Sequence, residues 1–185
     1  MFNEREVVSR ILKGDMPAFT LLVKQYERLV FHVINRLVKD DDDVADICQE
    51  VFIKVHKSLE RFQFESKLST WIARIAYLTA ITHLRKHQRQ RTDSMNDDIE
   101  NIHFTTEDPE TLLNKKQTAA YVDKLIKQLP EQYRTVVTLY HLNEFSYPEI
   151  AAITKMPEGT VKSYLFRARN VLKSKLEVYF KNEAL

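Results

Sequence analysis

The sequence predicts an all-α protein made of two small helical domains joined by an acidic flexible linker. Only 2 glycines and 5 prolines occur in 185 residues, which leaves little material for tight hairpins or phosphate-binding loops. Apolar residues recur at spacings of three and four along most of the chain. Residues 93–110 lack this periodicity, and they carry seven acidic residues but neither Lys nor Arg. We therefore expect domains at 1–92 and 113–185, with the linker at 93–112.

The first domain is predicted to contain helices over residues 4–13, 15–37, 43–60 and 69–91. Gly14 ends the first of these helices, and Asp15 is placed to cap the second. Ser69 is expected to cap the fourth helix. That helix turns strongly basic towards its end, where Arg85, Lys86, Arg89 and Arg91 follow one another closely.

Three features invite a metal site or another reactive site, and each has a simpler interpretation. The run Asp40–Asp43 lacks the glycine and glutamate that complete a calcium loop, so we expect a solvated turn that caps the next helix. His83 and His87 are spaced like a zinc pair, but no Glu follows His83 and the neighbouring residues are cationic. The single cysteine, Cys48, excludes an internal disulfide and falls on an apolar helix face. We expect no metal, no cofactor and no catalytic residue.

The second domain contains the outline of a DNA-binding helix-turn-helix. After helices marked by Leu125 and by Tyr133, the pair Ser146 and Glu149 forms a capping-box pattern that starts a short helix. A brief break then leads to Pro157, which is expected to begin a longer basic helix. A DNA-binding helix-turn-helix has this arrangement, in which a short helix and a tight turn precede a second, basic helix.

Four sequence blocks together resemble a known family. They occur in the family's order and span nearly the whole chain: 46–52, 62–76, 129–134 and 158–169. The chain resembles bacterial RNA polymerase sigma factors of the small, two-domain extracytoplasmic-function group of the sigma-70 family. The resemblance implies a protein that binds core RNA polymerase and directs promoter-specific transcription initiation, including recognition and opening of the minus-ten element.

The resemblance also implies which residues make these contacts. The polymerase-binding residues, which dock on the clamp helices of its largest subunit, would be Asp46, Gln49 and Glu50. The residues that contact the minus-ten element would be Phe64, Arg74, Tyr77, Arg85, Lys86, Arg89 and Arg91, whereas Phe62 and Trp71 are expected in the core. The residues that contact the minus-thirty-five element would be Thr160, Lys162, Ser163, Tyr164, Phe166 and Arg167.

An anti-sigma factor is a further partner that the resemblance implies, with a cytoplasmic location. We expect no membrane insertion, because no apolar run approaches the length of a membrane span. The chain departs from the family's pattern at Leu78 and Thr82, where Asn and Asp are common, and at Tyr164, where Arg is common. It also has Thr154-Lys155 where Leu-Gly is common in the helix-turn-helix.

Two other classes of protein share part of the pattern. A two-domain transcriptional regulator would use the helix-turn-helix on a duplex operator without joining polymerase. An interaction protein would bind a partner with its first domain and carry an incidental basic tail. Neither class requires the blocks around Asp46 and Trp71, so both blocks favour the sigma factor.

Overall fold

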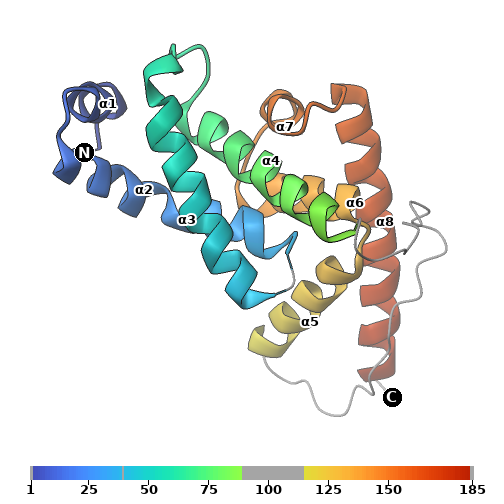
Figure 1. Ribbon diagram of the computed structural model, residues 1–185. Helices are drawn as coiled ribbons and strands as arrows, with labels where there is room; N and C mark the ends of the chain where they lie inside the picture. The colour runs from blue at the N-terminus through green and yellow to red at the C-terminus, as the bar shows by residue number, and fades with distance from the viewer. Residues whose placement is uncertain (1, 39, 89–114, 184–185) are drawn as a thin grey trace.

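The computed structural model describes residues 2–38, 40–88 and 115–183, and every regular element within them is helical (Figure 1). The all-α class is therefore confirmed. The predicted linker at 93–112 lies outside the described residues. None of the described helices combines the length and the apolar character needed to cross a membrane.

The N-terminal domain is built from helices packed around α2. Its elements are α1 (Glu4–Leu12), α2 (Met16–Asn35), α3 (Asp41–Ser58), the 3-10 turn η1 (Leu59–Arg61) and α4 (Leu68–Gln88). Helices α1, α3 and α4 all contact α2, and α3 also contacts α4. Apolar side chains at helical spacing form the centre of this packing, and they include Leu22, Val30, Val51, Val55 and Ile72.

The helix starts follow capping chemistry, with two differences from the sequence prediction. Asp15 caps α2 as predicted, because its carboxylate accepts a hydrogen bond from the Ala18 N–H at 3.1 Å. Asp40 caps α3 by accepting from the Asp42 N–H at 3.0 Å. The remaining aspartates of the run thus form the first turn of α3, where the helix dipole favours negative charge. Ser69 is not a cap, since α4 already begins at Leu68.

The C-terminal domain contains α5 (Lys115–Gln128), α6 (Glu131–Val137), the π-helical turn η3 (Thr138–Leu142), α7 (Tyr147–Thr154) and α8 (Glu158–Glu183). Its core is formed where α6 and α7 pack against α8. Buried apolar side chains from all three helices meet there: Val136, Val137, Ile150, Ile153, Val161, Leu165 and Ala168.

Helices α7 and α8 form the predicted helix-turn-helix. The Glu149 carboxylate accepts a hydrogen bond from the Ser146 N–H at 2.9 Å, which confirms the capping box. The turn is closed by Lys155, which takes a left-handed conformation with φ of 62°. Pro157 immediately precedes α8 rather than starting it.

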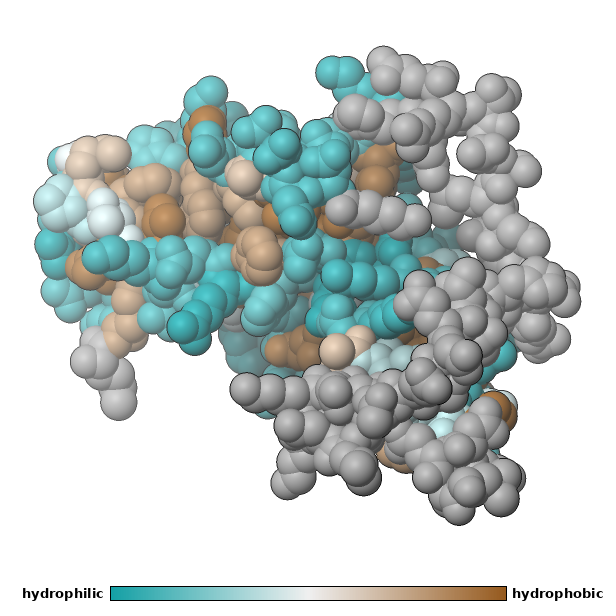
Figure 2. All heavy atoms as spheres, turned by 90° about the horizontal axis from the view of Figure 1, so that it is seen from below, coloured by the Kyte–Doolittle hydropathy of each residue, from teal (hydrophilic) through white to brown (hydrophobic). Residues whose placement is uncertain are grey.

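The two domains pack against each other in this structure. Helix α4 of the N-terminal domain lies against α7 of the helix-turn-helix (Figure 1). Buried residues of both domains join one continuous hydrophobic cluster. On the face shown in Figure 2, hydrophilic side chains alternate with separate small apolar patches.

Candidate polymerase and nucleic-acid interfaces

Helix α3 presents a polar face to solvent. Asp46, Gln49 and Glu50 are all exposed there, at helical spacings that place them side by side. The Glu50 carboxylate pairs with the Lys54 ammonium at 2.7 Å, and Lys54 also donates to the Thr79 hydroxyl at 3.2 Å. The opposite face is buried through Val44, Ile47, Val51 and Val55. Helix α3 is therefore packed through its apolar face, and the carboxylates of its polar face stay accessible to solvent.

Ile53 extends this face and was missed by the sequence analysis. It lies one turn after Gln49 and Glu50, and its side chain is 53% exposed. From apolar periodicity alone, an isoleucine in an amphipathic helix is expected in the core. Only its position three residues after Glu50, on the polar side, signals a surface role.

The loop between η1 and α4 holds an aromatic cluster. The Phe62 ring is buried, with centroid distances of 4.6 Å to Phe64 and 5.1 Å to Trp71. Phe64 has a left-handed backbone with φ of 57°, and the Arg5 guanidinium lies 4.7 Å from its ring centroid. Phe64 is thus half-buried, and α1 contributes to the position of the loop.

The remaining residues predicted to contact the minus-ten element lie in different environments. Arg85 and Lys86 are exposed and Arg74 is half-buried, whereas Arg89 and Arg91 lie outside the described residues. Tyr77 differs from the expectation, because it is only 7% exposed and lies at the contact between the domains. Burial, together with the charge of Glu131 on α6, raises the pKa of the Tyr77 phenol to about 12. Tyr77 therefore has no access to DNA in this arrangement.

The outer face of α8 carries most of the residues predicted to contact the minus-thirty-five element. Lys162, Ser163, Phe166 and Arg167 are exposed, and Phe166 is 65% exposed. The Lys162 ammonium pairs with the Glu158 carboxylate at 2.9 Å. Thr160, near the start of the helix, is half-buried. The face thus combines cations, a hydroxyl and an exposed aromatic ring.

Tyr164 lies at the edge of this face rather than on it. Its ring packs on Tyr133 of α6 with a centroid distance of 4.5 Å, and it is half-buried. The aromatic replacement at this position therefore joins the domain core in part.

His83 lies beside a carboxylate, and Cys48 packs against the hydrophobic core. The His83 Nε2 atom lies 3.2 Å from an Asp43 carboxylate oxygen. Cys48 is half-buried against the core, and burial raises the pKa of its thiol. Across the part of the chain that the structure describes, His, Cys, Asp and Glu side chains form no group of three or more that could hold a metal ion.

Comparison with known proteins matches both domains separately. The family described as Sigma-70 region 2 matches residues 22–90, and the family described as Sigma-70, region 4 matches residues 119–172. The first match begins within α2 and covers α3, with its polar face, and α4. The second covers the helix-turn-helix.

Relatives of similar length match along nearly the whole chain. The ECF RNA polymerase sigma-E factor of Escherichia coli K12 is 38% identical over 182 residues, which cover 95% of each chain. The RNA polymerase sigma-H factor of Pseudomonas aeruginosa is 36% identical and covers 95% of this chain and 94% of its own. A solved structure of the sigma factor RpoE in complex with the anti-sigma factor NepR from Bartonella quintana has a TM-score of 0.66 at 25% identity, covering 86% of this chain and 97% of that one.

These matches decide between the classes of protein that the sequence left open. Neither a regulator that works without polymerase nor an incidental interaction protein accounts for similarity over both domains and nearly the full length. The protein is not an enzyme, and its expected partners are core RNA polymerase and promoter DNA. The chain belongs to the extracytoplasmic-function group of the sigma-70 family and is a sigma factor that directs promoter-specific transcription initiation.

Proposed function

We propose that this sigma factor docks on the clamp helices of the largest polymerase subunit through Asp46, Gln49 and Glu50. The exposure of these three side chains on one face of α3 supports the assignment. Two carboxylates and an amide that meet basic side chains would fix register and orientation as well as affinity. Ile53, exposed on the same face, adds an apolar contact.

The segment 61–91 would read and open the minus-ten element. Base capture requires a pocket for an unstacked base, aromatic surface that replaces lost stacking, and cations that bind phosphate. The loop at Phe62–Lys67 supplies aromatic rings, while Arg85 and Lys86 supply exposed cations. Arg74 and Tyr77 complete the set once the C-terminal domain moves away.

The segment 146–169 would read the minus-thirty-five element as duplex. The N-terminus of α8 offers free backbone N–H groups to phosphate. Lys162 and Arg167 offer donors to guanine edges or phosphate, and exposed Phe166 offers an apolar contact. We assign the two promoter-binding domains to residues 1–92 and 113–185, with the acidic linker between them.

Two further features of the proposal concern regulation and location. The Bartonella quintana relative was solved in complex with an anti-sigma factor, and we extend this class of partner to the present chain. The chain would act in the cytoplasm, where polymerase and promoter DNA meet.

Reconstitution with purified bacterial core RNA polymerase tests the proposal. We expect a stable complex on size exclusion and transcripts with a defined start site on a promoter library. Reversing the charges with D46K/E50K should abolish complex formation, because like charges would face the basic clamp surface. The helical circular-dichroism signal should persist, since both side chains are exposed.

Glu27→Lys is the matched control, because Glu27 is an exposed acidic residue on α2 outside this face. It changes the net charge in the same direction and should leave complex formation unchanged. If D46K/E50K binds polymerase as tightly as the unmodified chain, the docking assignment is wrong. A chain that binds duplex DNA yet yields no start-specific transcripts would contradict the whole proposal.

A further inference from the structure

Phe64 has a backbone conformation that a phenylalanine rarely adopts. Its φ of 57° lies in the left-handed region, where Cβ crowds the following carbonyl and a bulky side chain is an outlier. In the described part of the chain, the other non-glycine residues with positive φ are Glu144 and Lys155, which are both polar. Strained residues gather at functional sites, where the surrounding contacts hold them in place. The contacts that hold Phe64 therefore indicate what its loop does.

Two side chains hold the Phe64 ring in this conformation. The buried Phe62 ring lies 4.6 Å from it between centroids and is itself 5.1 Å from Trp71. The Arg5 guanidinium lies 4.7 Å from the centroid of the Phe64 ring. It comes from α1, which contacts η1 and lies beside the end of α3 in Figure 1. A cation–π contact therefore ties the loop before α4 to the first helix of the chain.

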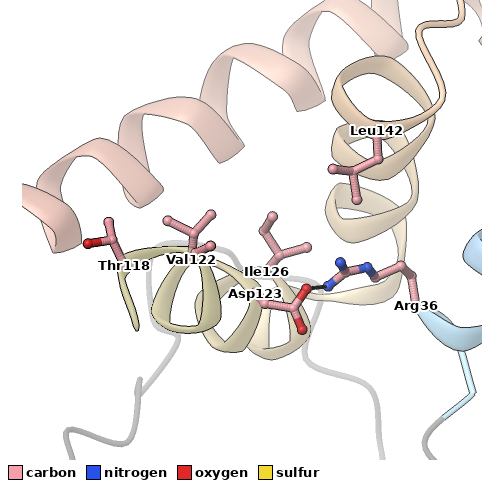
Figure 3. A pocket seen from close by; sticks show the side chains of 7 residues that line it. Arg36, Thr118, Val122, Asp123, Ile126 and Leu142 are labelled. Atoms are coloured by element: carbon pink, nitrogen blue, oxygen red, sulfur yellow. Dashed lines mark ion pairs between the residues drawn. The ribbon is translucent and has the colours of Figure 1, made fainter. Parts of the chain in front are cut away.

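The charge of Arg5 is not neutralised by a carboxylate. Arg10, on the same helix, pairs with Asp15 at 2.8 Å, and Arg36 just after α2 pairs with Asp123 of α5 (Figure 3). Within the part of the chain that the structure describes, no such ion pair holds Arg5. Its side chain is exposed to solvent. The guanidinium is therefore available to an anion from outside the protein.

The ring and the guanidinium together form the kind of site that single-stranded nucleic acid requires. Bases stack on accessible aromatic rings, and cations beside the rings bind the backbone phosphates. The Phe64 ring is only half-buried, so part of its surface is open to a base. Because Arg5 lies 4.7 Å from this ring, a base on the ring and a phosphate of the same strand can be bound together.

We propose that Arg5 is both the positioning residue for Phe64 and a phosphate ligand, so that α1 forms part of the single-stranded DNA site. The cation–π contact holds the Phe64 ring in place for an unstacked base, and the guanidinium binds a phosphate of the same strand. The inference rests on the function proposed for residues 61–91. It extends that site to a residue of a separate helix.

The salt dependence of DNA binding measures the phosphate contact of Arg5. The full-length chain is titrated into fluorescent, random-sequence single-stranded DNA decamers at several salt concentrations, and binding is followed by anisotropy. Each phosphate neutralised on a single strand contributes about 0.7 to the slope of log affinity against log salt. Arg5→Gln should therefore reduce the magnitude of the slope by about 0.7. At low salt, its affinity should fall about three- to ten-fold.

Two variants separate the role of Arg5 from a general loss of charge. Lys13→Gln is the matched control, because Lys13 is an exposed cation just past the end of α1. It lies eight residues after Arg5, which is about 12 Å along a helix. It removes the same charge and should change neither the slope nor the affinity. Arg5→Lys keeps the charge but lacks the planar guanidinium, so it should retain the slope and lose part of the affinity.

Photochemical cross-linking tests whether the ring holds a base. Ultraviolet irradiation with thymine-containing decamers should join a base to Phe64, and mass spectrometry of the digested protein locates the link. At saturating DNA, Arg5→Gln should reduce the yield several-fold, because the ring is no longer held in position. Phe64→Gly suits the left-handed backbone but removes the stacking surface, so decamer affinity should fall about five-fold or more. In that background, Arg5→Gln should weaken binding less than in the unmodified chain.

The possible outcomes separate this inference from the proposed function. If Arg5→Gln keeps the salt slope of Lys13→Gln, or if its cross-link yield at saturating DNA is unchanged, the inference is wrong. A lower Tm of Arg5→Gln with an unaltered slope would make Arg5 a structural residue only and would also overturn it. If the unmodified chain fails to bind decamers, or gives no start-specific transcripts with polymerase, the proposed function is contradicted instead.

Discussion

The turn of the helix-turn-helix yields a sharp stability prediction at Lys155. This residue has a φ of 62°, a left-handed conformation in which Cβ of an ordinary residue crowds the following carbonyl. Glycine adopts it freely but loses more backbone entropy on folding. The left-handed conformation costs lysine about 1–2 kcal/mol. Glycine avoids this cost but loses about 0.5–1 kcal/mol in backbone entropy, so the substitution leaves a net gain in stability. Lys155→Gly should therefore raise the free energy of unfolding by about 0.5–1 kcal/mol.

Lys155→Ala separates the backbone effect from the loss of the lysine side chain. It removes the same exposed side chain but keeps Cβ, so its stability should stay close to that of the unmodified chain. Urea unfolding followed by circular dichroism gives both values, and a gain of this size raises Tm by about 1–4 °C. The reasoning is refuted if the alanine variant gains as much as the glycine variant, or if Lys155→Gly is destabilised.

Three further changes test the packing around the proposed interfaces. Burial opposes ionisation of Glu149, but hydrogen bonds from Ser146 and Lys67 outweigh it and lower its pKa from 4.5 to about 2. The contribution of the Glu149 carboxylate to the free energy of unfolding is thus present above pH 4.5 and is lost as pH falls towards 2. Between pH 5 and about pH 2.5, urea unfolding should show that the unmodified chain loses about 1–2 kcal/mol more stability than Glu149→Gln. If the stabilities of the two proteins fall in parallel with pH, the prediction is wrong. Leu165→Ala, at a side chain 1% exposed, should cost about 2–5 kcal/mol in thermal unfolding, and a loss below about 1 kcal/mol would place Leu165 outside the core. Tyr26→Phe removes a hydroxyl that donates to the Glu4 carboxylate at 2.6 Å; denaturant titration should show a loss of about 1–2 kcal/mol, and unchanged stability would mean that the bond adds nothing.

Local sequence rules predicted the helices and most of their starts. Asp15 and the pair Ser146 and Glu149 each supply a side-chain oxygen near free backbone N–H groups, and this chemistry is complete within four residues. The start of α3 was harder to predict, because any aspartate of the run Asp40–Asp43 could cap the helix. The structure uses the first, which leaves the other three charges in the first turn of the helix.

The environment of the candidate sites could not be predicted from local rules. Tyr77 was expected at a DNA-facing surface, but it is buried at the contact with the C-terminal domain, where Glu131 lies 54 residues further along the chain. Glu149 was recognised as a cap, yet nothing in its own segment indicates that its second oxygen binds Lys67 and Thr70. Such contacts depend on how the two domains meet, and no periodicity within either domain encodes that.

The Thr154-Lys155 turn, where the chain departs from the family pattern, is closed by local contacts. The Thr154 hydroxyl donates to the Ile150 carbonyl at 2.8 Å and accepts from the Met156 N–H at 3.3 Å. Lys155 then adopts the left-handed conformation that glycine would take. The turn is thus closed by the Thr154 hydroxyl and by a lysine in a conformation that glycine adopts more readily.

The accessibility of the two proposed interfaces gives an order to the steps of initiation. Asp46, Gln49 and Glu50 are exposed while the domains are packed, whereas Tyr77 is covered. If the proposed assignments hold, polymerase could bind α3 while the domains are packed, whereas promoter single strand could not reach Tyr77 on α4. A ligand shifts the equilibrium between packed and separated domains only by its difference in affinity for the two states. Polymerase would therefore have to make contacts with the separated domains that it cannot make with the packed ones. The free chain would then bind promoter DNA weakly until polymerase has docked.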